Sequence, residues 1–154
     1  MLTLNKVKVA SEMFVEAHAR YATARRDIDY ITSIMLSGAV IGVIGPLLKE
    51  QGGRTTHELL VAIANAISSP GDAPAYEGMF RTVYNGLKHA GNDKQKQKVR
   101  ASDDLEIRTN LPLEAARLLD AAKNDFRNIE VSAEVRQGLS PEFIQLLEAE
   151  EDYT

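Results

Sequence analysis

The chain of 154 residues contains no cysteine. Without cysteine there is no disulfide framework, no thiolate nucleophile and no cysteine-ligated zinc site, and the composition suits a reducing cytosol. The chain also lacks an excess of positive charge, because 18 lysines and arginines are outnumbered by 22 aspartates and glutamates, for a formal net charge of −4. This balance excludes a globally basic nucleic-acid-binding protein, so any basic surface must be local.

Phosphate loops and metal-ligand pairs are missing as well. Three spaced glycines beginning at Gly38 are not followed by the lysine and hydroxyl residue of a nucleotide-binding loop. The three histidines, His18, His57 and His89, have no second histidine or paired carboxylate at metal-ligand spacing. We therefore expect no metal and no cofactor. His57 lies in the first turn of a predicted helix, where we expect it to be exposed.

One long stretch without charge runs from Tyr30 to Leu48 and is long enough to cross a membrane. Its serines, glycines and proline, together with the amphipathic pattern of the other predicted helices, favour a buried central helix instead. No apolar stretch follows Lys6 and Lys8, so no secretory signal is predicted. We expect a cytoplasmic protein that is not bound to a membrane.

Hydrophobic residues make up 44% of the chain and charged residues 26%, which is ordinary for a protein with a buried core. A length of 154 residues predicts about one domain. We expect one helical domain over residues 1–138, followed by a short terminal helix and an acidic tail over 139–154.

Apolar residues at alternating steps of three and four form one stripe near the start of the chain. They are Phe14, Ala17, Tyr21, Ala24, Ile28, Ile31 and Met35. The stripe predicts one long helix or two collinear helices, with a break where charged residues crowd near 25–29. We place the second helix over 27–51, ended by Gly52 and Gly53.

Capping signals place the next helix. Thr55 and Glu58 form a capping box, which predicts a helix that ends near Ile67. The apolar face of this helix consists of Leu59, Leu60, Ile63 and Ile67.

Further helices are predicted over 75–90, ended by Gly91, and over 112–128. The sequence Ser140-Pro141-Glu142 starts a short last helix. Alternating residues from Leu105 to Arg108 predict a short strand pair near 98–109. Five or six helices joined by short loops predict an all-α, up-and-down bundle.

The helix predicted over 75–90 bears on function. At about 100° per residue, its apolar stripe consists of Tyr76, Phe80, Val83 and Leu87. The opposite side carries Arg81, Asn85 and His89, with Lys88 beside them. A guanidinium, an amide and an imidazole in one line can bind a phosphate or a planar base, with histidine as general acid or base. The alternative is an ordinary solvated face.

The segment from Tyr84 to Gly91 reads YNGLKHAG and resembles the Arg-Asn-x-Leu-Lys-His stretch of bacterial members of the HEPN (higher eukaryote and prokaryote nucleotide-binding) superfamily. Residues 37–40 and 113–126 are similar to a second and a late helix of such proteins. The resemblance implies an all-α bundle and a homodimer. It also implies metal-independent ribonuclease activity, as in many members, with an arginine and a histidine of each protomer lining a cleft at the dimer interface.

Residue by residue, His89 matches the family histidine and Asn85 the polar residue that follows the arginine. The arginine position itself holds Tyr84. Arg81 or Lys88 would therefore have to stabilise the charge that develops on a phosphate during cleavage. The resemblance thus implies a protein that binds RNA or a nucleotide phosphate. More specifically, it implies a ribonuclease that is catalytically degenerate.

The charge layout adds a local basic segment to an acidic chain. Between residues 81 and 100 one acid accompanies six basic residues, namely Arg81, Lys88, Lys94, Lys96, Lys98 and Arg100. A basic loop beside His89 can steer phosphate backbones, with an affinity that falls as salt rises. The alternative is an ordinary solvated loop that the acidic residues of 142–152 neutralise.

A second class of function also fits the sequence. In it, the chain is a non-enzymatic helical module for oligomerisation or interaction, which docks a protein partner or an antitoxin. In either class we expect a homodimer, with the helices over 75–90 near the two-fold axis. The small residues Gly38, Ala39 and Gly42 would permit close contact there.

Overall fold

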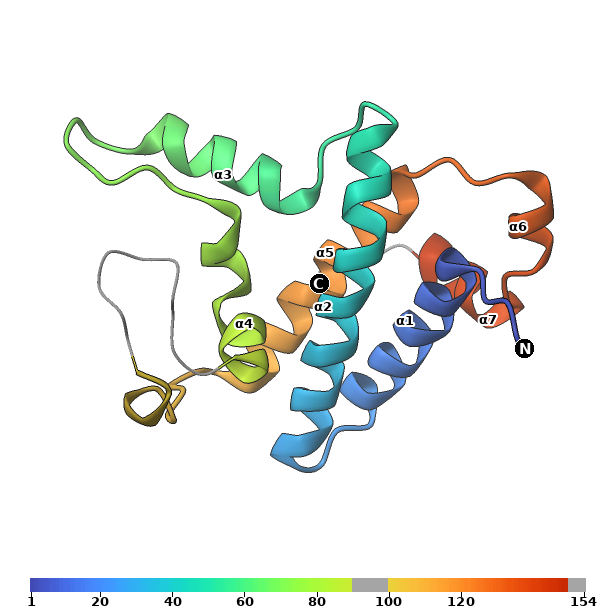
Figure 1. The fold of residues 1–154 in the computed structure, drawn as a ribbon, viewed down its shortest axis with the longest axis horizontal. Coiled ribbons are helices and arrows are strands. Elements are labelled where there is room, and N and C mark those ends of the chain that lie inside the picture. Colours follow the sequence, from blue (N-terminus) through green and yellow to red (C-terminus); the bar gives the residue numbers. More distant parts are fainter. Residues whose placement is uncertain (90–99, 150–154) are drawn as a thin grey trace.

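Seven α-helices and two short 3-10 helices form the regular structure of residues 1–89 and 100–149, the part of the chain that the computed structural model describes (Figure 1). The α-helices are α1 (Lys6–Ala22), α2 (Asp27–Glu50), α3 (Thr56–Ile67), α4 (Thr82–Lys88), α5 (Leu111–Asn128), α6 (Ala133–Gln137) and α7 (Pro141–Glu148). The 3-10 helices are η1 (Glu77–Arg81) and η2 (Ala101–Asp103). The predicted all-α class is confirmed, and α6 is an addition to the predicted helices.

Helices α1 and α2 are not collinear but form a hairpin that turns at residues 23–26 (Figure 1). The Asp29 carboxylate accepts hydrogen bonds from the backbone N–H groups of Arg25 (3.1 Å) and Arg26 (3.0 Å). These bonds satisfy backbone donors at the start of α2, where the chain reverses. The predicted break and the start at residue 27 are therefore confirmed, whereas the collinear arrangement is wrong.

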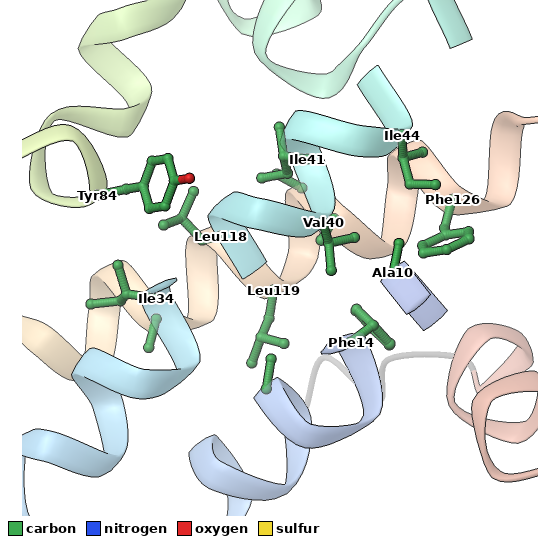
Figure 2. Close-up of a cluster of buried hydrophobic side chains, with 14 of the residues drawn as sticks. Ala10, Phe14, Ile34, Val40, Ile41, Ile44, Tyr84, Leu118, Leu119 and Phe126 are labelled. Atoms are coloured by element: carbon green, nitrogen blue, oxygen red, sulfur yellow. The ribbon is translucent and has the colours of Figure 1, made fainter. Parts of the chain in front are cut away.

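The core lies where α2 packs between α1 and α5, and Figure 2 shows side chains of all three helices meeting there. They include Ala10, Phe14, Ile34, Val40, Ile41, Ile44, Leu118, Leu119 and Phe126. Helix α2 is long and apolar enough to cross a membrane, a property that core helices share. It occupies the central position that the sequence predicts, since Ile34, Val40 and Ile44 are fully buried.

Helix α7 adds to this core at the far end of the chain. The Ser140 hydroxyl caps it by accepting the N–H of Phe143 at 3.2 Å, as the sequence predicts. Phe143 is fully buried, with its ring centroid 5.9 Å from that of Phe14 and 4.8 Å from that of Phe126. On α5, Lys123 donates to the carbonyl of Ala149, so a cation stabilises the carbonyl end of α7.

Helix α3 is attached to the bundle by its first turn. The capping box is confirmed, because the Thr55 hydroxyl accepts the N–H of Glu58 at 3.2 Å and the Glu58 carboxylate accepts the N–H of Thr55 at 2.8 Å. From α5, Asp125 accepts hydrogen bonds from the N–H of Thr56 (2.7 Å) and from its hydroxyl (2.8 Å). Beyond this turn α3 projects away from the three core helices (Figure 1).

The single helix predicted over 75–90 is wrong. Its first part is the 3-10 helix η1, and Arg81 then adopts a non-helical backbone (φ −126°, ψ 22°) before α4 begins. Gly78, a poor helix former, lies within η1 and contributes to this break. Gly91, the predicted end of the helix, lies outside the described residues.

The predicted strand pair is wrong for the described part of 98–109, since residues 100–109 contain no strand. One of the alternating apolar residues, Ile107, packs on a helix instead, whereas Leu105 is exposed. Ile107 lies so close to Gly86 of α4 that a Cβ built on this glycine would be 3.0 Å from its Cδ1. The glycine therefore accommodates the isoleucine, and the segment needs no partner strand.

Candidate functional site

Tyr84, at the position of the family arginine, belongs to the core. It is 9% exposed, and its ring lies directly over Gly38 of α2, where it leaves no room for a Cβ. In Figure 2 the ring lies beside Leu118 of α5. The small residue at 38 thus serves packing within the chain. Gly38 is covered by α4, so the dimer surface expected there is wrong at this residue.

Arg81 turns toward the end of α2 and η1 rather than along α4. Its guanidinium Nη2 lies 3.9 Å from a carboxylate oxygen of Glu77. The same carboxylate accepts a hydrogen bond from Lys49 at 2.9 Å, and Glu58 lies 3.2 Å from that ammonium. The hydrogen bond that Lys49 donates to Glu77 is the main reason that the pKa of Lys49 is raised. Two carboxylates therefore compensate two cations in this cluster, which leaves little net charge for a phosphate.

Asn85 and His89 are both exposed on α4. His89 is the residue that ends this helix, and its backbone N–H donates to the carbonyl of Asn85 at 3.1 Å. The polar stripe predicted for Arg81, Asn85 and His89 does not form, because the non-helical backbone at Arg81 breaks the 100° spacing on which it depended.

Two other predicted phosphate ligands, Lys88 and Arg100, lie on either side of residues 90–99. Lys88 is exposed and its ammonium lies 5.0 Å from the ring centroid of Tyr84. Arg100 is exposed and forms an ion pair with Asp103 at 3.0 Å. Lys94, Lys96 and Lys98 lie outside the described residues.

No family model, curated protein or solved structure matches this chain. The HEPN resemblance and the roles that it implies for His89, Asn85 and Arg81 therefore stay predictions. Within residues 1–89 and 100–149, no group of three or more histidines or carboxylates could hold a metal ion.

A second candidate site lies between α3, η1 and α5, where a cavity of about 430 Å³ opens to the surface. Its lining comprises Thr56, His57, Leu60, Met79, Phe80, Glu114, Arg117, Asp120 and Ala121. Apolar side chains of α3 and η1 form one wall, and polar side chains of α5 form the other. The volume falls within the range of about 300–1,000 Å³ that small-molecule sites occupy.

His57 is buried in the wall of this cavity, with 4% of its surface exposed, so the prediction of an exposed residue is wrong. Its ring stacks on that of Phe80 at 6.0 Å between centroids and 16° between planes. Burial lowers its pKa to about 4, with a further contribution from the positive charge of Arg81. The imidazole is consequently neutral near pH 7. The capping box located the start of α3 but carried no information on which of its sides faces η1 and α5.

A third notable surface, which we call the α3 face, runs along α3 and borders the cavity at Leu60. It consists of Leu59, Leu60, Ile63 and Ile67 on α3, and it continues onto Met79 of η1 at the mouth of the cavity. Ile63 is 59% exposed and Ile67 is 79% exposed. These side chains are the predicted apolar face of the helix, and within this chain they remain largely uncovered.

Proposed function

We propose that this chain is a non-enzymatic helical module that self-associates through the α3 face. The observation that carries the proposal is the uncovered apolar stripe on a helix that is fully formed and capped. Isolated helices of this length are marginal in water, and packing of an apolar side normally stabilises them. A second copy of the chain would provide that packing.

The area of the α3 face fits a homodimer. Its five side chains expose on the order of 500 Å² of apolar surface, which is at the upper end of what monomers show. Homodimer interfaces are about two-thirds apolar, so this patch corresponds to roughly 800 Å² per copy. That is about the size of a standard stable interface.

The lack of charge on the α3 face also favours a second copy of the chain as its partner. No charged residue occurs from Leu59 to Ile67, so a two-fold axis through this face would bring no like charges together. Because α3 also lacks lysine and arginine, it offers no attraction to an anionic lipid surface. A second copy therefore fits this face better than a membrane does.

The catalytic form of the HEPN-like proposal has less support. Tyr84 occupies the arginine position inside the core, and Arg81 is paired with Glu77. No fixed positive charge next to His89 is available from these two residues.

Sedimentation equilibrium of the full chain with matched glutamate variants tests self-association. We expect the natural sequence to be a dimer at micromolar concentration and Ile63→Glu to be a monomer, since the charge would be buried at the interface. The control is Ile28→Glu, because Ile28 is a similarly exposed isoleucine (50%) in the first turn of α2. A monomeric natural protein, or equal association of both variants, would contradict the proposal.

A second candidate function is binding of RNA or a nucleotide phosphate, and the exposed cations favour it. Lys88 and His89 are exposed at the end of α4, and Arg100 is exposed where the described chain resumes. Because Ile107 packs on Gly86, the segment after Arg100 lies beside α4. Cations from both parts of the chain could thus contact one phosphate backbone.

A further inference from the structure

We propose that the cavity between α3, η1 and α5 binds a small neutral aromatic molecule that carries one hydroxyl or amide group. This site shares Leu60 and Met79 with the α3 face, but the proposal of a ligand does not rest on self-association. Three features of the cavity lead to this class of ligand: an imidazole in its wall, an aromatic and apolar surface, and a rim in which opposite charges pair with each other.

His57 supplies the hydrogen-bonding group. The side chain is 4% exposed, and its ring nitrogens are not among the polar atoms that are buried without a hydrogen-bond partner, so they keep access to the open cavity. A ligand with a matching polar group can pair with them there in place of water. Because a neutral imidazole has one donor and one acceptor nitrogen, a hydroxyl or an amide can pair with it in either direction.

The apolar wall selects an aromatic body for the ligand. Phe80 stacks on His57, and Leu60 and Met79 complete this side of the cavity. Aromatic rings pack well edge-to-face on such rings, and methionine sulfur makes favourable contacts with aromatic edges. The volume of about 430 Å³ suits one or two rings.

The rim disfavours an anion. Glu114 and Arg117 pair with each other at 3.1 Å on the α5 side of the cavity, and Asp120 adds a further carboxylate. A carboxylate or phosphate ligand would therefore meet a lining with no spare positive charge. An uncharged ligand has no such penalty.

The experiment compares phenol with toluene, which has the same ring but no hydroxyl. Titrations of the full-length protein are followed by ¹⁵N–¹H NMR at the amides of Leu60 and Ala121. We expect both probes to shift these signals and phenol to bind about fivefold more tightly, the effect of one net hydrogen bond. In His57→Phe, which keeps the stacked ring, this preference should disappear.

Leu60→Trp provides a second test if His57→Phe does not fold. Leu60 is partly exposed at the cavity mouth, so a larger side chain can fill the space and should abolish the shifts from both probes. Unshifted signals in the natural protein, or an unchanged preference for phenol in His57→Phe, would overturn the proposal.

The same titration in Ile63→Glu separates this site from self-association. Binding in both the natural protein and Ile63→Glu supports a ligand site, whatever the oligomeric state proves to be. Binding only in Ile63→Glu would show that a second copy fills the cavity, which would overturn the ligand site and leave the dimer intact.

Discussion

At the scale of single residues, Tyr84 and Gly38 show that a residue within a motif-like segment can serve packing in the core. The ring covers the glycine so closely that any side chain at position 38 would collide with it. Close packing of this kind leaves little tolerance for added atoms. The contact between α4 and α2 therefore gives Tyr84 a packing role.

Replacing Tyr84 with arginine should destabilise the protein rather than create a ribonuclease. The guanidinium would enter the core without a carboxylate partner, at a cost of about 3 kcal/mol or more in the free energy of unfolding. Urea denaturation measures this cost. Asn85→Arg, at the exposed neighbouring position, serves as the control and should change stability by less than about 0.5 kcal/mol.

His57 predicts a dependence of stability on pH. Its pKa is near 6.5 in the unfolded chain and about 4 in the folded protein, so the unfolded state binds more protons between these values. Its contribution to stability is complete above pH 6.5 and is lost as the pH falls toward 4.

Thermal unfolding between pH 7 and pH 4 measures this loss, which should be smaller in His57→Phe. It will not vanish, because burial also lowers the pKa of His18. His89→Phe, which changes an exposed histidine, provides the comparison. An identical profile in His57→Phe would show that this imidazole titrates normally.

At the scale of elements, α3 differs from α1, α2 and α5 because hydrogen bonds hold it near its two ends while apolar side chains along it stay exposed. Asp125 holds Thr56 in its first turn, and the Asn65 side chain accepts the N–H of Ala75 from the returning chain. Within the stripe, Leu60 lines the cavity toward η1 and α5, whereas Ile63 and Ile67 are 59% and 79% exposed.

Hydrogen exchange should therefore report self-association at α3. We expect slow exchange of its amides in the natural protein and faster exchange in Ile63→Glu, because the helix loses the packing that stabilises it. The amides of α2 and α5 should be unaffected. Equal exchange at α3 in the two proteins, measured by mass spectrometry at dimer-forming concentration, would show that nothing covers this face.

At the scale of the whole molecule, the net charge of −4 opposes binding of nucleic acid, so any affinity must come from the local basic segment. If the segment binds single-stranded RNA, the affinity will fall steeply with salt as counterions are released. Changing Lys94, Lys96 and Lys98 together to alanine should flatten this dependence. Fluorescence anisotropy at several salt concentrations measures it, and an affinity independent of salt would contradict the phosphate-binding proposal.

RNA cleavage assays distinguish the non-enzymatic module from an active HEPN-like ribonuclease. A non-enzymatic module should leave RNA intact without added metal. Cleavage by the natural protein that is lost in His89→Ala would show that the HEPN-like site is active in spite of Tyr84.

The sequence by itself determined the features that depend on neighbouring residues. The capping box at Thr55 and Glu58 and the N-cap at Ser140 form as predicted, because their hydrogen bonds join residues three positions apart. The long apolar pattern of α5 likewise predicted its extent to within one residue at the start. The all-α class follows from these local signals.

Only the tertiary structure decided which surfaces are covered. Periodicity predicts that a helix has an apolar side, but what packs there depends on residues far away in the chain. Tyr84 is buried because α4 lies on Gly38, and His57 because η1 and α5 enclose it. The apolar side of α3 stays exposed because, after its first turn, this helix projects away from the three core helices (Figure 1). The candidate cavity and the α3 face both arise from these long-range arrangements, which the spacing of residues along the sequence does not predict.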